Sequence, residues 1–229
     1  MSATIYWLGG WASSLACWEP MLREQFPEFK HSFPDTHVLL DRSPMELGLH
    51  PSWKERGDVV AAWSMGSLLA HQWIDRGLWP VDLPLLSLCP VFRFLRPEGF
   101  GQPVLLRMEK KLGVDHDAVL RDFWRRMPKA GEIPEIWGES WIQGTRNYSD
   151  ETLIHGLEFL RTTVVEASAL RNPPCRWELL AGDRDLLAPA PAAESLPSGA
   201  LLHIYTGGHL PFWECPDEMR ACFNRLTSA

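Results

Sequence analysis

The sequence lacks any apolar run of the roughly 18 to 20 residues that a helix needs to cross a bilayer. Its first ten residues, MSATIYWLGG, lack the basic region and long apolar stretch of a secretory leader. We therefore expect a cytoplasmic protein with no membrane partner. Internal repeats and low-complexity tracts are also absent, and 229 residues suit one domain with room for an inserted subdomain.

Cysteine motifs that bind metals are missing as well. No two cysteines form a CxxC pair, and no histidine lies near a cysteine at the spacing of zinc ligands. We expect reduced structural thiols, no metal and no organic cofactor. The five cysteines are Cys17, Cys89, Cys175, Cys215 and Cys222.

An excess of positive charge is absent too, because the formal net charge is −7 at pH 7. A negative total argues against nucleic acid as a partner. The charge is uneven, however. Between Arg93 and Lys129, nine basic residues stand against five acidic ones, so this segment carries +4 and the remainder −11. The basic segment is either a solvated helix surface or a surface for an acidic partner.

The order of short β-like runs and helical patterns is typical of βα units on a parallel sheet. After Pro90 the pattern changes to longer, Arg-rich helical segments, and β-like character returns near Arg176. We expect an α/β fold of about six mainly parallel strands flanked by helices, with a core of residues 1–92 and 170–229 and a helical cap inserted at 93–169. Strands are expected at 4–8, 37–40, 59–63, 84–88, 176–182 and 200–205, and helices around 18–26, 65–76, 192–196 and 216–226.

The stretch VVAAWSMGSLLA, residues 59–70, raises the first question about chemistry. Ser64 lies between a strand-like and a helix-like run, which suits a helix N-cap. The five residues AWSMG are also close to G-x-S-x-G, the elbow that holds a nucleophilic serine on a sharp strand-to-helix turn. Such a turn needs small residues two before and two after the serine, and here Ala62 replaces the first glycine. The local pattern leaves both interpretations open.

A serine nucleophile also needs a base, a group that orients the base, and donors for the oxyanion. The segment AGDRDLLAP, residues 181–189, follows an expected strand and supplies Asp183 and Asp185. The segment GGHLPFWECPDEM, residues 207–219, places His209 between the last expected strand and helix. Each alone would be a solvated turn. Together they follow strands in the order serine, acid, histidine.

On these residues the sequence resembles the α/β-hydrolase superfamily. Within it the resemblance is to the pimeloyl-[acyl-carrier protein] methyl ester esterases of biotin synthesis and their carboxylesterase relatives. GGWASSLACW, residues 9–18, is similar to that group's HGWG-type loop. GDRDLLAP is similar to its G-x-x-D-x-x-x-P acid loop, and GGHLPFWECPDE to its histidine loop. The resemblance covers both ends of the expected core, whereas the cap matches only in size and helical character.

Carried over by position, the resemblance implies that Ser64 is the nucleophile and His209 the base. Asp185 is implied as the acid, rather than Asp183, by its place in the acid loop. The backbone N–H groups of Trp11 and Met65 would form the oxyanion hole, and the side chains of Trp11, Met65 and Trp63 would line the acyl pocket. A departure lies at Gly9, which stands where the family has histidine and leaves the loop without a usual anchor.

The resemblance implies hydrolysis of a carboxylic ester, with the methyl ester of a pimeloyl chain on its acyl carrier protein as substrate. The same residues would serve a general short-chain carboxylesterase or an acyl thioesterase, and a catalytically inactive binding module is a further alternative. An acidic carrier protein would suit a basic patch on the cap, because guanidinium groups bind carboxylate and phosphate well. That patch would comprise Arg107, Lys110, Lys111, Arg121, Arg125 and Arg126.

Overall fold

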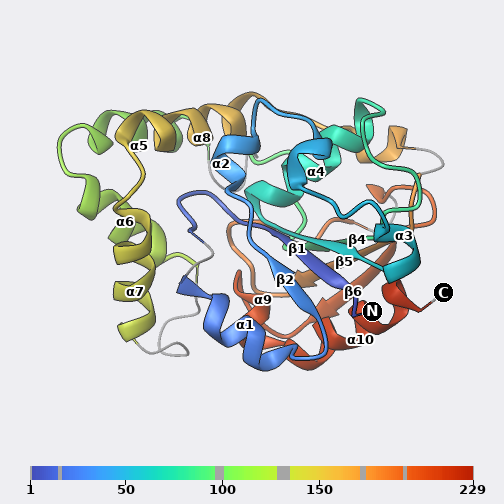
Figure 1. Cartoon of the computed structure of the whole chain (residues 1–229). Coiled ribbons are helices and arrows are strands. Elements are labelled where there is room, and N and C mark those ends of the chain that lie inside the picture. Colours follow the sequence, from blue (N-terminus) through green and yellow to red (C-terminus); the bar gives the residue numbers. More distant parts are fainter. Residues whose placement is uncertain are drawn as a thin grey trace.

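A six-stranded sheet runs through the molecule in the order β2-β1-β3-β4-β5-β6 (Figure 1). The computed structural model describes residues 2–14, 17–95, 101–127, 135–170, 174–192 and 195–228. Every neighbouring pair of strands is parallel, which confirms the expected sheet. The strands are β1 (Thr4–Leu8), β2 (Lys30–Ser32), β3 (Val59–Trp63), β4 (Leu85–Leu88), β5 (Trp177–Gly182) and β6 (Leu201–Tyr205).

The four central strands are buried at every position. Parallel strands covered by helices on both faces have no solvent side, so their sequences are near-continuous apolar runs. TIYWL, VVAAW and LLSL follow this rule. Figure 1 shows α1 (Glu19–Gln25) and α10 (Pro216–Thr227) below the sheet and α4 (Met65–Asp75) above it.

One expected strand is wrong. Residues 37–40 were expected as the second strand, but they lie in and just after the short helix α2 (Thr36–Leu39), and the edge strand is β2. The Asp35 carboxylate accepts a hydrogen bond from the N–H of His37 and so caps α2. The apolar run His-Val-Leu-Leu is β-like in composition, whereas β2 is a three-residue, partly exposed Lys-His-Ser without an apolar pattern.

The expected helices around 18–26, 65–76 and 216–226 are present as α1, α4 and α10. Gly77 follows α4 in the left-handed conformation with φ of 67°. The short helix expected at 192–196 includes residues outside the described ranges. Further short elements are η2 (Pro44–Leu47), α3 (Trp53–Arg56), η3 (Ala167–Ala169) and α9 (Pro211–Glu214).

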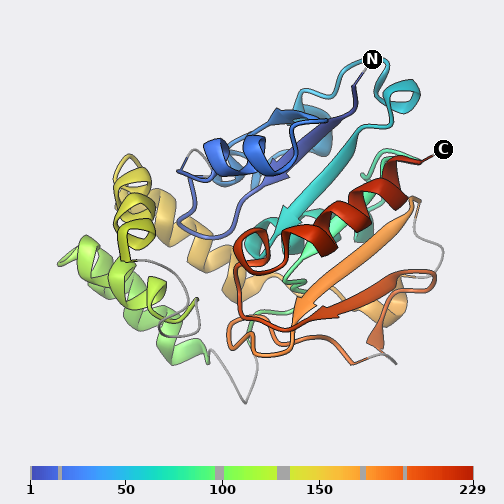
Figure 2. The ribbon, with the colours of Figure 1, turned by 90° about the horizontal axis from the view of Figure 1, so that it is seen from below.

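Four helices follow β4 before the chain returns to the sheet at β5: α5 (Gln102–Leu112), α6 (His116–Trp124), α7 (Glu135–Thr145) and α8 (Asp150–Thr162). Asp115 and Ser149 cap α6 and α8 with their side chains. Figures 1 and 2 show α5, α6 and α7 gathered at one side of the sheet, while α8 reaches back to contact α2 and α4. We refer to α5–α8 as the cap; the boundaries 93–169 stay a prediction.

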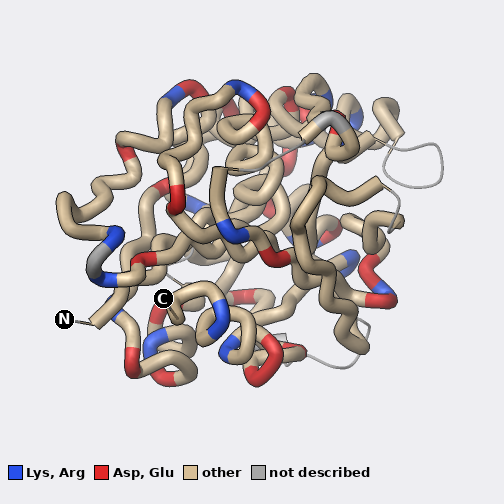
Figure 3. The backbone as a smooth tube through the Cα atoms, turned by 90° about the vertical axis from the view of Figure 1, so that its right-hand side faces the viewer, with Lys and Arg blue, Asp and Glu red and all other residues tan. Residues whose placement is uncertain are grey.

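Seen from the side opposite the cap, acidic and basic positions are interspersed along the backbone (Figure 3). None of the helices in the described ranges has both the length and the apolar character that a membrane crossing requires. The five cysteines are all free thiols.

Candidate active site

Ser64 occupies the turn between β3 and α4. Its backbone has φ of 56° and ψ of −114°, a conformation that residues other than glycine rarely adopt and that costs free energy. Its side chain caps none of the free N–H groups of α4, so the helix-cap interpretation does not describe this serine. Instead the hydroxyl of Ser67, one turn later, donates to the carbonyl of Ser64 over 2.7 Å and braces the turn.

Ala62 and Gly66, the small residues on either side of Ser64, are under different spatial constraints. A Cβ on Gly66 would lie 2.7 Å from the carbonyl oxygen of Leu8 and 2.8 Å from that of Gly9, so only glycine fits. Ala62 is fully buried in β3, in register with Leu8 of β1. The elbow therefore has room for the methyl group of Ala62 and requires glycine only at its second small position.

Ser64, His209 and Asp185 form one hydrogen-bonded chain. His209 Nε2 lies 2.9 Å from Ser64 Oγ, and His209 Nδ1 lies 2.6 Å from Asp185 Oδ2. All three are buried, with 5%, 1% and 4% of their surface exposed. The second oxygen of Asp185 accepts from the N–H groups of Leu187 and Ala188 at 2.8 and 2.9 Å, which fixes the carboxylate. This geometry lets an imidazole accept a hydroxyl proton while a carboxylate orients the ring.

Asp183 does not belong to this chain. It is exposed, and its carboxylate accepts from the N–H of Gly207 at 3.0 Å. That bond ties the acid loop to the histidine loop without touching the imidazole. The structure thus brings Asp185, and not Asp183, to His209.

His209 is positioned by several groups for which the sequence did not indicate this role. The indole N–H of Trp63 donates to the carbonyl of His209 over 2.8 Å, and the N–H of His209 donates to the carbonyl of Met127 over 3.2 Å. The Glu214 carboxylate accepts from the N–H groups of Gly208 at 2.9 Å and Leu210 at 3.2 Å. Glu214 lies five residues after His209, and no spacing rule indicated its role.

The loop after β1 lies against Ser64. A Cβ on Gly10 would be 3.3 Å from that of Ser64, so the two backbones approach closely. Within the described ranges, the N–H groups of Trp11 and Met65 have no hydrogen-bond partner. Two such donors beside a buried hydroxyl are what an oxyanion hole requires.

Residues far away in sequence anchor this loop, although Gly9 replaces the histidine of the resembled family. The N–H of Gly9 donates to the hydroxyl of Thr36 over 2.6 Å, and that of Ala12 donates to His37 Nε2 over 3.2 Å. The indole N–H of Trp11 donates to the carbonyl of Leu153 in α8 over 2.8 Å. Hydrogen bonds to α2 and α8 therefore hold the loop, although Gly9 lacks the side chain that anchors it in the resembled family.

The expected pocket residues are packed among other rings. The ring of Trp11 meets Phe123 of α6 edge-on at 4.8 Å between centroids, and that of Trp63 meets Phe212 at 5.0 Å. Both tryptophans are 2% exposed and Met65 is fully buried. Their role as walls of an acyl pocket stays a prediction.

Two groups of side chains in the described ranges have ligand atoms close enough to hold a metal ion. In the first, Cys89 joins Asp185 and His209, and burial raises the pKa of the Cys89 thiol well above its ordinary value. The second lies on β5, β6 and α10, and there the guanidinium of Arg225 already occupies the centre. Its Nη2 lies 2.7 Å from Glu178, 3.2 Å from His203 and 3.1 Å from Cys222.

The six basic residues expected to bind a partner divide into two groups. Arg107, Lys111 and Arg126 line one cavity of about 110 Å³ between α5 and α6. Its other lining residues are Val104, Met108, Val119, Asp122 and Phe123, and we call the whole the cap cavity. Of the remaining three, Arg121 pairs with Glu139 of α7, Arg125 pairs with Asp122 at 3.2 Å, and Lys110 is exposed on α5.

A scan against protein-family models finds no match, and a search of curated protein sequences also finds none. Solved structures, in contrast, match over almost the whole chain. An esterase from Exiguobacterium antarcticum has a TM-score of 0.80 at 15% sequence identity, covering 99% of this chain and 92% of that one. An enol-lactonase from Burkholderia xenovorans has a TM-score of 0.76 at 16% identity, covering 99% and 91%.

A bromoperoxidase from Bacillus anthracis has a TM-score of 0.75 at 14% identity, covering 98% of this chain and 92% of that one. At such low identity the likeness is one of overall fold. In this chain the fold is a parallel sheet with a helical segment between its fourth and fifth strands. The chain has the α/β-hydrolase fold.

Proposed function

We propose that this protein is a serine hydrolase that cleaves carboxylic esters. The observation that carries the proposal is the chain Ser64–His209–Asp185, with the serine held on a strained elbow. His209 accepts the proton of Ser64 Oγ as that oxygen attacks the ester carbonyl, and then donates the proton to the leaving alcohol. Water, deprotonated by the same imidazole, hydrolyses the acyl-enzyme. The names of the similar structures, an esterase and an enol-lactonase, support this chemistry.

Charge development explains the remaining groups of the site. Asp185 keeps the imidazole in the tautomer that accepts from Ser64 and stabilises its protonated form. The negative oxygen of the tetrahedral intermediate would be bound by the N–H groups of Trp11 and Met65. No step in this scheme calls for a metal or an organic cofactor.

Replacement of the nucleophile tests the proposal. Ser64→Ala should lower kcat for p-nitrophenyl butyrate by at least about 10⁴-fold and abolish labelling by a fluorophosphonate probe, because the acyl-enzyme can no longer form. Ser87→Ala is the matched control, since Ser87 also hydrogen-bonds a buried histidine, His71, at 2.8 Å. It should leave hydrolysis and labelling intact. Wild-type protein that neither hydrolyses the ester nor reacts with the probe would favour a binding module.

For the substrate we propose the methyl ester of a pimeloyl chain carried on acyl carrier protein, as in biotin synthesis. The support is the cap cavity, whose exposed basic residues and buried or half-buried apolar residues suit an acidic carrier and its acyl group. Phe123 lines this cavity and also contacts the ring of Trp11, so the cavity adjoins the oxyanion loop. A general short-chain carboxylesterase or an acyl thioesterase is the alternative for the same residues. A cytoplasmic location stays a prediction.

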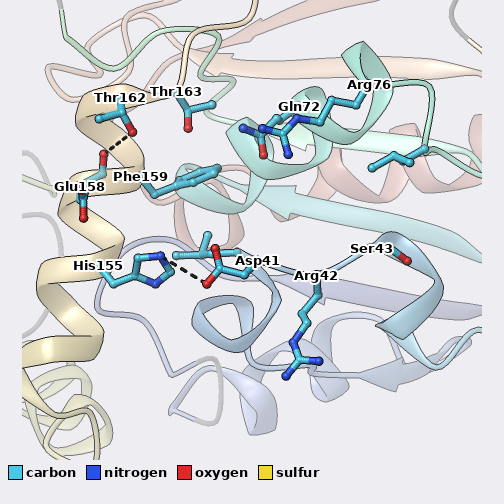
Figure 4. Close-up of a pocket in the computed structure, with 12 residues that line it drawn as sticks. Asp41, Arg42, Ser43, Gln72, Arg76, His155, Glu158, Phe159, Thr162 and Thr163 are labelled. Carbon is cyan, nitrogen blue, oxygen red and sulfur yellow. Dashed lines mark hydrogen bonds and ion pairs between the residues drawn. The ribbon is translucent and has the colours of Figure 1, made fainter.

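Charge reversal at the exposed basic residues separates these substrates. The double variant Arg107→Glu/Lys111→Glu should lower kcat/KM for the carrier-bound methyl ester by roughly 10-fold or more, since exposed charges steer association. It should leave p-nitrophenyl butyrate unaffected. The matched control is Arg42→Glu/Arg76→Glu, which reverses two exposed charges in a separate cleft of about 600 Å³ (Figure 4). Equal effects on both esters would mean that Arg107 and Lys111 are solvated surface residues and do not bind a carrier protein.

Two further measurements test the assignment of the substrate. Comparing the methyl ester with the thioester of the same acyl chain distinguishes esterase from thioesterase activity. Complementation of a strain that lacks the biotin-pathway esterase tests the physiological assignment. Failure to complement, with full activity on short esters, would favour the general carboxylesterase.

A further inference from the structure

The backbone N–H of Ala12, which follows Trp11, donates its hydrogen bond to a group outside its own loop. Ala12 is fully buried and has φ of 52°, a left-handed conformation that is unfavourable for alanine. A buried N–H without an acceptor carries a large desolvation cost, so the position of this peptide depends on the group that accepts from it. That group is Nε2 of His37, at 3.2 Å.

His37 is itself held from two sides. On its own helix, Asp35 accepts from the N–H of His37, and the neighbouring Thr36 binds the N–H of Gly9. On the side of the cap, a Cβ on Gly156 of α8 would lie 2.7 Å from Cε1 of His37 and 2.8 Å from Cδ1 of Trp11. Because Gly156 has no side chain, the backbone of α8 can pack directly against the imidazole of His37 and the indole of Trp11.

The hydrogen bond requires a neutral ring. Because the N–H of Ala12 is the donor, Nε2 must offer a lone pair, and a proton there would oppose the donor. Burial lowers the pKa of His37 to about 4, which keeps the lone pair available near neutral pH.

The titratable groups that face His37 come from α2, from α8 and from the segment before α8. Asp35 lies at the start of α2 and favours the charged ring, whereas His155 of α8 disfavours it. Tyr148, before α8, has its ring centroid 4.8 Å from the imidazole and donates its hydroxyl to Asp35. Figure 4 shows His155 pointing toward the carboxylate of Asp41, 3.5 Å away.

We propose that His37 is a positioning residue for the oxyanion hole: it accepts the N–H of Ala12 and so holds the peptide N–H of Trp11 toward Ser64. This inference rests on the proposed ester hydrolysis. On this proposal, His37 of α2 anchors the loop after β1, which Gly9 cannot do because it has no side chain.

The test compares three variants with p-nitrophenyl butyrate. His37→Phe keeps a ring but removes the acceptor, and should lower kcat on the order of 10- to 100-fold, less than the full loss of an oxyanion donor, with KM little changed. His37→Gln places an amide oxygen near the position of Nε2 and should recover kcat to within about 3-fold of wild type. The matched control is His31→Phe, because Nδ1 of His31 accepts from the indole N–H of Trp7 at 3.0 Å, away from the oxyanion loop. It should lower thermal stability without lowering kcat.

Unchanged kcat in His37→Phe overturns the inference, and so does an equal loss in His37→Phe and His37→Gln. If His37→Phe does not fold, His37→Asn takes its place, since the shorter amide reaches only the position of Nδ1 and should show the same loss. The proposed function fails separately, when the wild-type protein neither turns over the ester nor reacts with a fluorophosphonate.

Discussion

Two buried serine–histidine hydrogen bonds lie in the same core, and they differ in their surroundings. Ser64 Oγ lies 2.9 Å from Nε2 of His209, and Ser87 Oγ lies 2.8 Å from Nε2 of His71. The other nitrogen of His209 faces the carboxylate of Asp185, whereas that of His71 lies 2.8 Å from the carbonyl of Val91. Distance alone does not distinguish the two pairs.

The third partner and the location distinguish them. Ser64 follows the end of β3 on a strained turn, while Ser87 lies within β4 with regular pairing. His71 is fully buried and stacks on Phe92 at 4.2 Å between centroids, and burial lowers its pKa to about 3. A histidine with no carboxylate partner and no access to substrate stays neutral. A base therefore requires a strand-end position and an acid as well as a serine.

Among changes that test this comparison, the largest effect should come from removing that acid. Asp185→Asn should lower kcat for p-nitrophenyl butyrate by about 10³- to 10⁴-fold, because an amide favours the wrong tautomer of His209 and cannot stabilise its charged form. This change makes the third partner of His209 neutral, as it already is for His71. Steady-state kinetics measures the loss, and urea unfolding checks that the variant is folded.

The control is Asp183→Asn, two residues earlier in the same loop. Its carboxylate contacts the backbone of Gly207 and not the imidazole, so kcat should change by less than about 3-fold. A greater loss in Asp183→Asn than in Asp185→Asn would move the acid to Asp183.

Local sequence patterns predict the pair Ser64–His209 but not the pair Ser87–His71. The AWSMG elbow, the acid loop and the histidine loop each follow an apolar strand, and parallel strands end at one edge of a sheet. The order of these loops could therefore predict that Ser64 and His209 meet an acid of the 181–189 loop, and the resemblance to the family's acid loop selected Asp185 over Asp183. Nothing in the sequence indicates that Ser87 and His71 pair, because that contact depends on how α4 packs on β4.

The same reasoning explains what was missed. The edge strand β2 is short and polar, so it lacks the apolar alternation by which strands are identified. Trp11 donates to the carbonyl of Leu153, 142 residues away, and every residue offers such a carbonyl. The partners of the oxyanion loop, His37 among them, therefore become visible only in three dimensions.

An intermediate effect concerns the pH dependence of stability, to which both His71 and His37 should contribute. In the unfolded chain a histidine has a pKa of about 6.5. Since burial lowers the pKa of His71 to about 3 and that of His37 to about 4, the unfolded chain binds more protons between pH 6.5 and 4. The free energy of unfolding should thus fall as pH falls, by about 1.4 kcal/mol per pH unit for each histidine.

His71→Gln isolates one of these contributions. Between pH 6 and 4.5, its free energy of unfolding should fall less steeply than that of wild type, by about 1.4 kcal/mol per pH unit. Urea unfolding at several pH values measures both slopes. His50→Gln, at an exposed position, serves as the control. Identical slopes for His71→Gln and wild type would mean that His71 is protonated in the folded protein.

The smallest expected effect lies at Ala62, which is in register with Ser87 and two residues before Ser64. Ala62→Gly restores the usual glycine of the elbow. It should lower the free energy of unfolding by about 1 kcal/mol, because glycine gains more freedom in the unfolded chain. The kcat should stay within about 2-fold of wild type, since the close backbone contacts are at Gly66 rather than at Ala62. A 10-fold change in kcat would show instead that the methyl group of Ala62 sets the angle at which β3 presents Ser64 to His209.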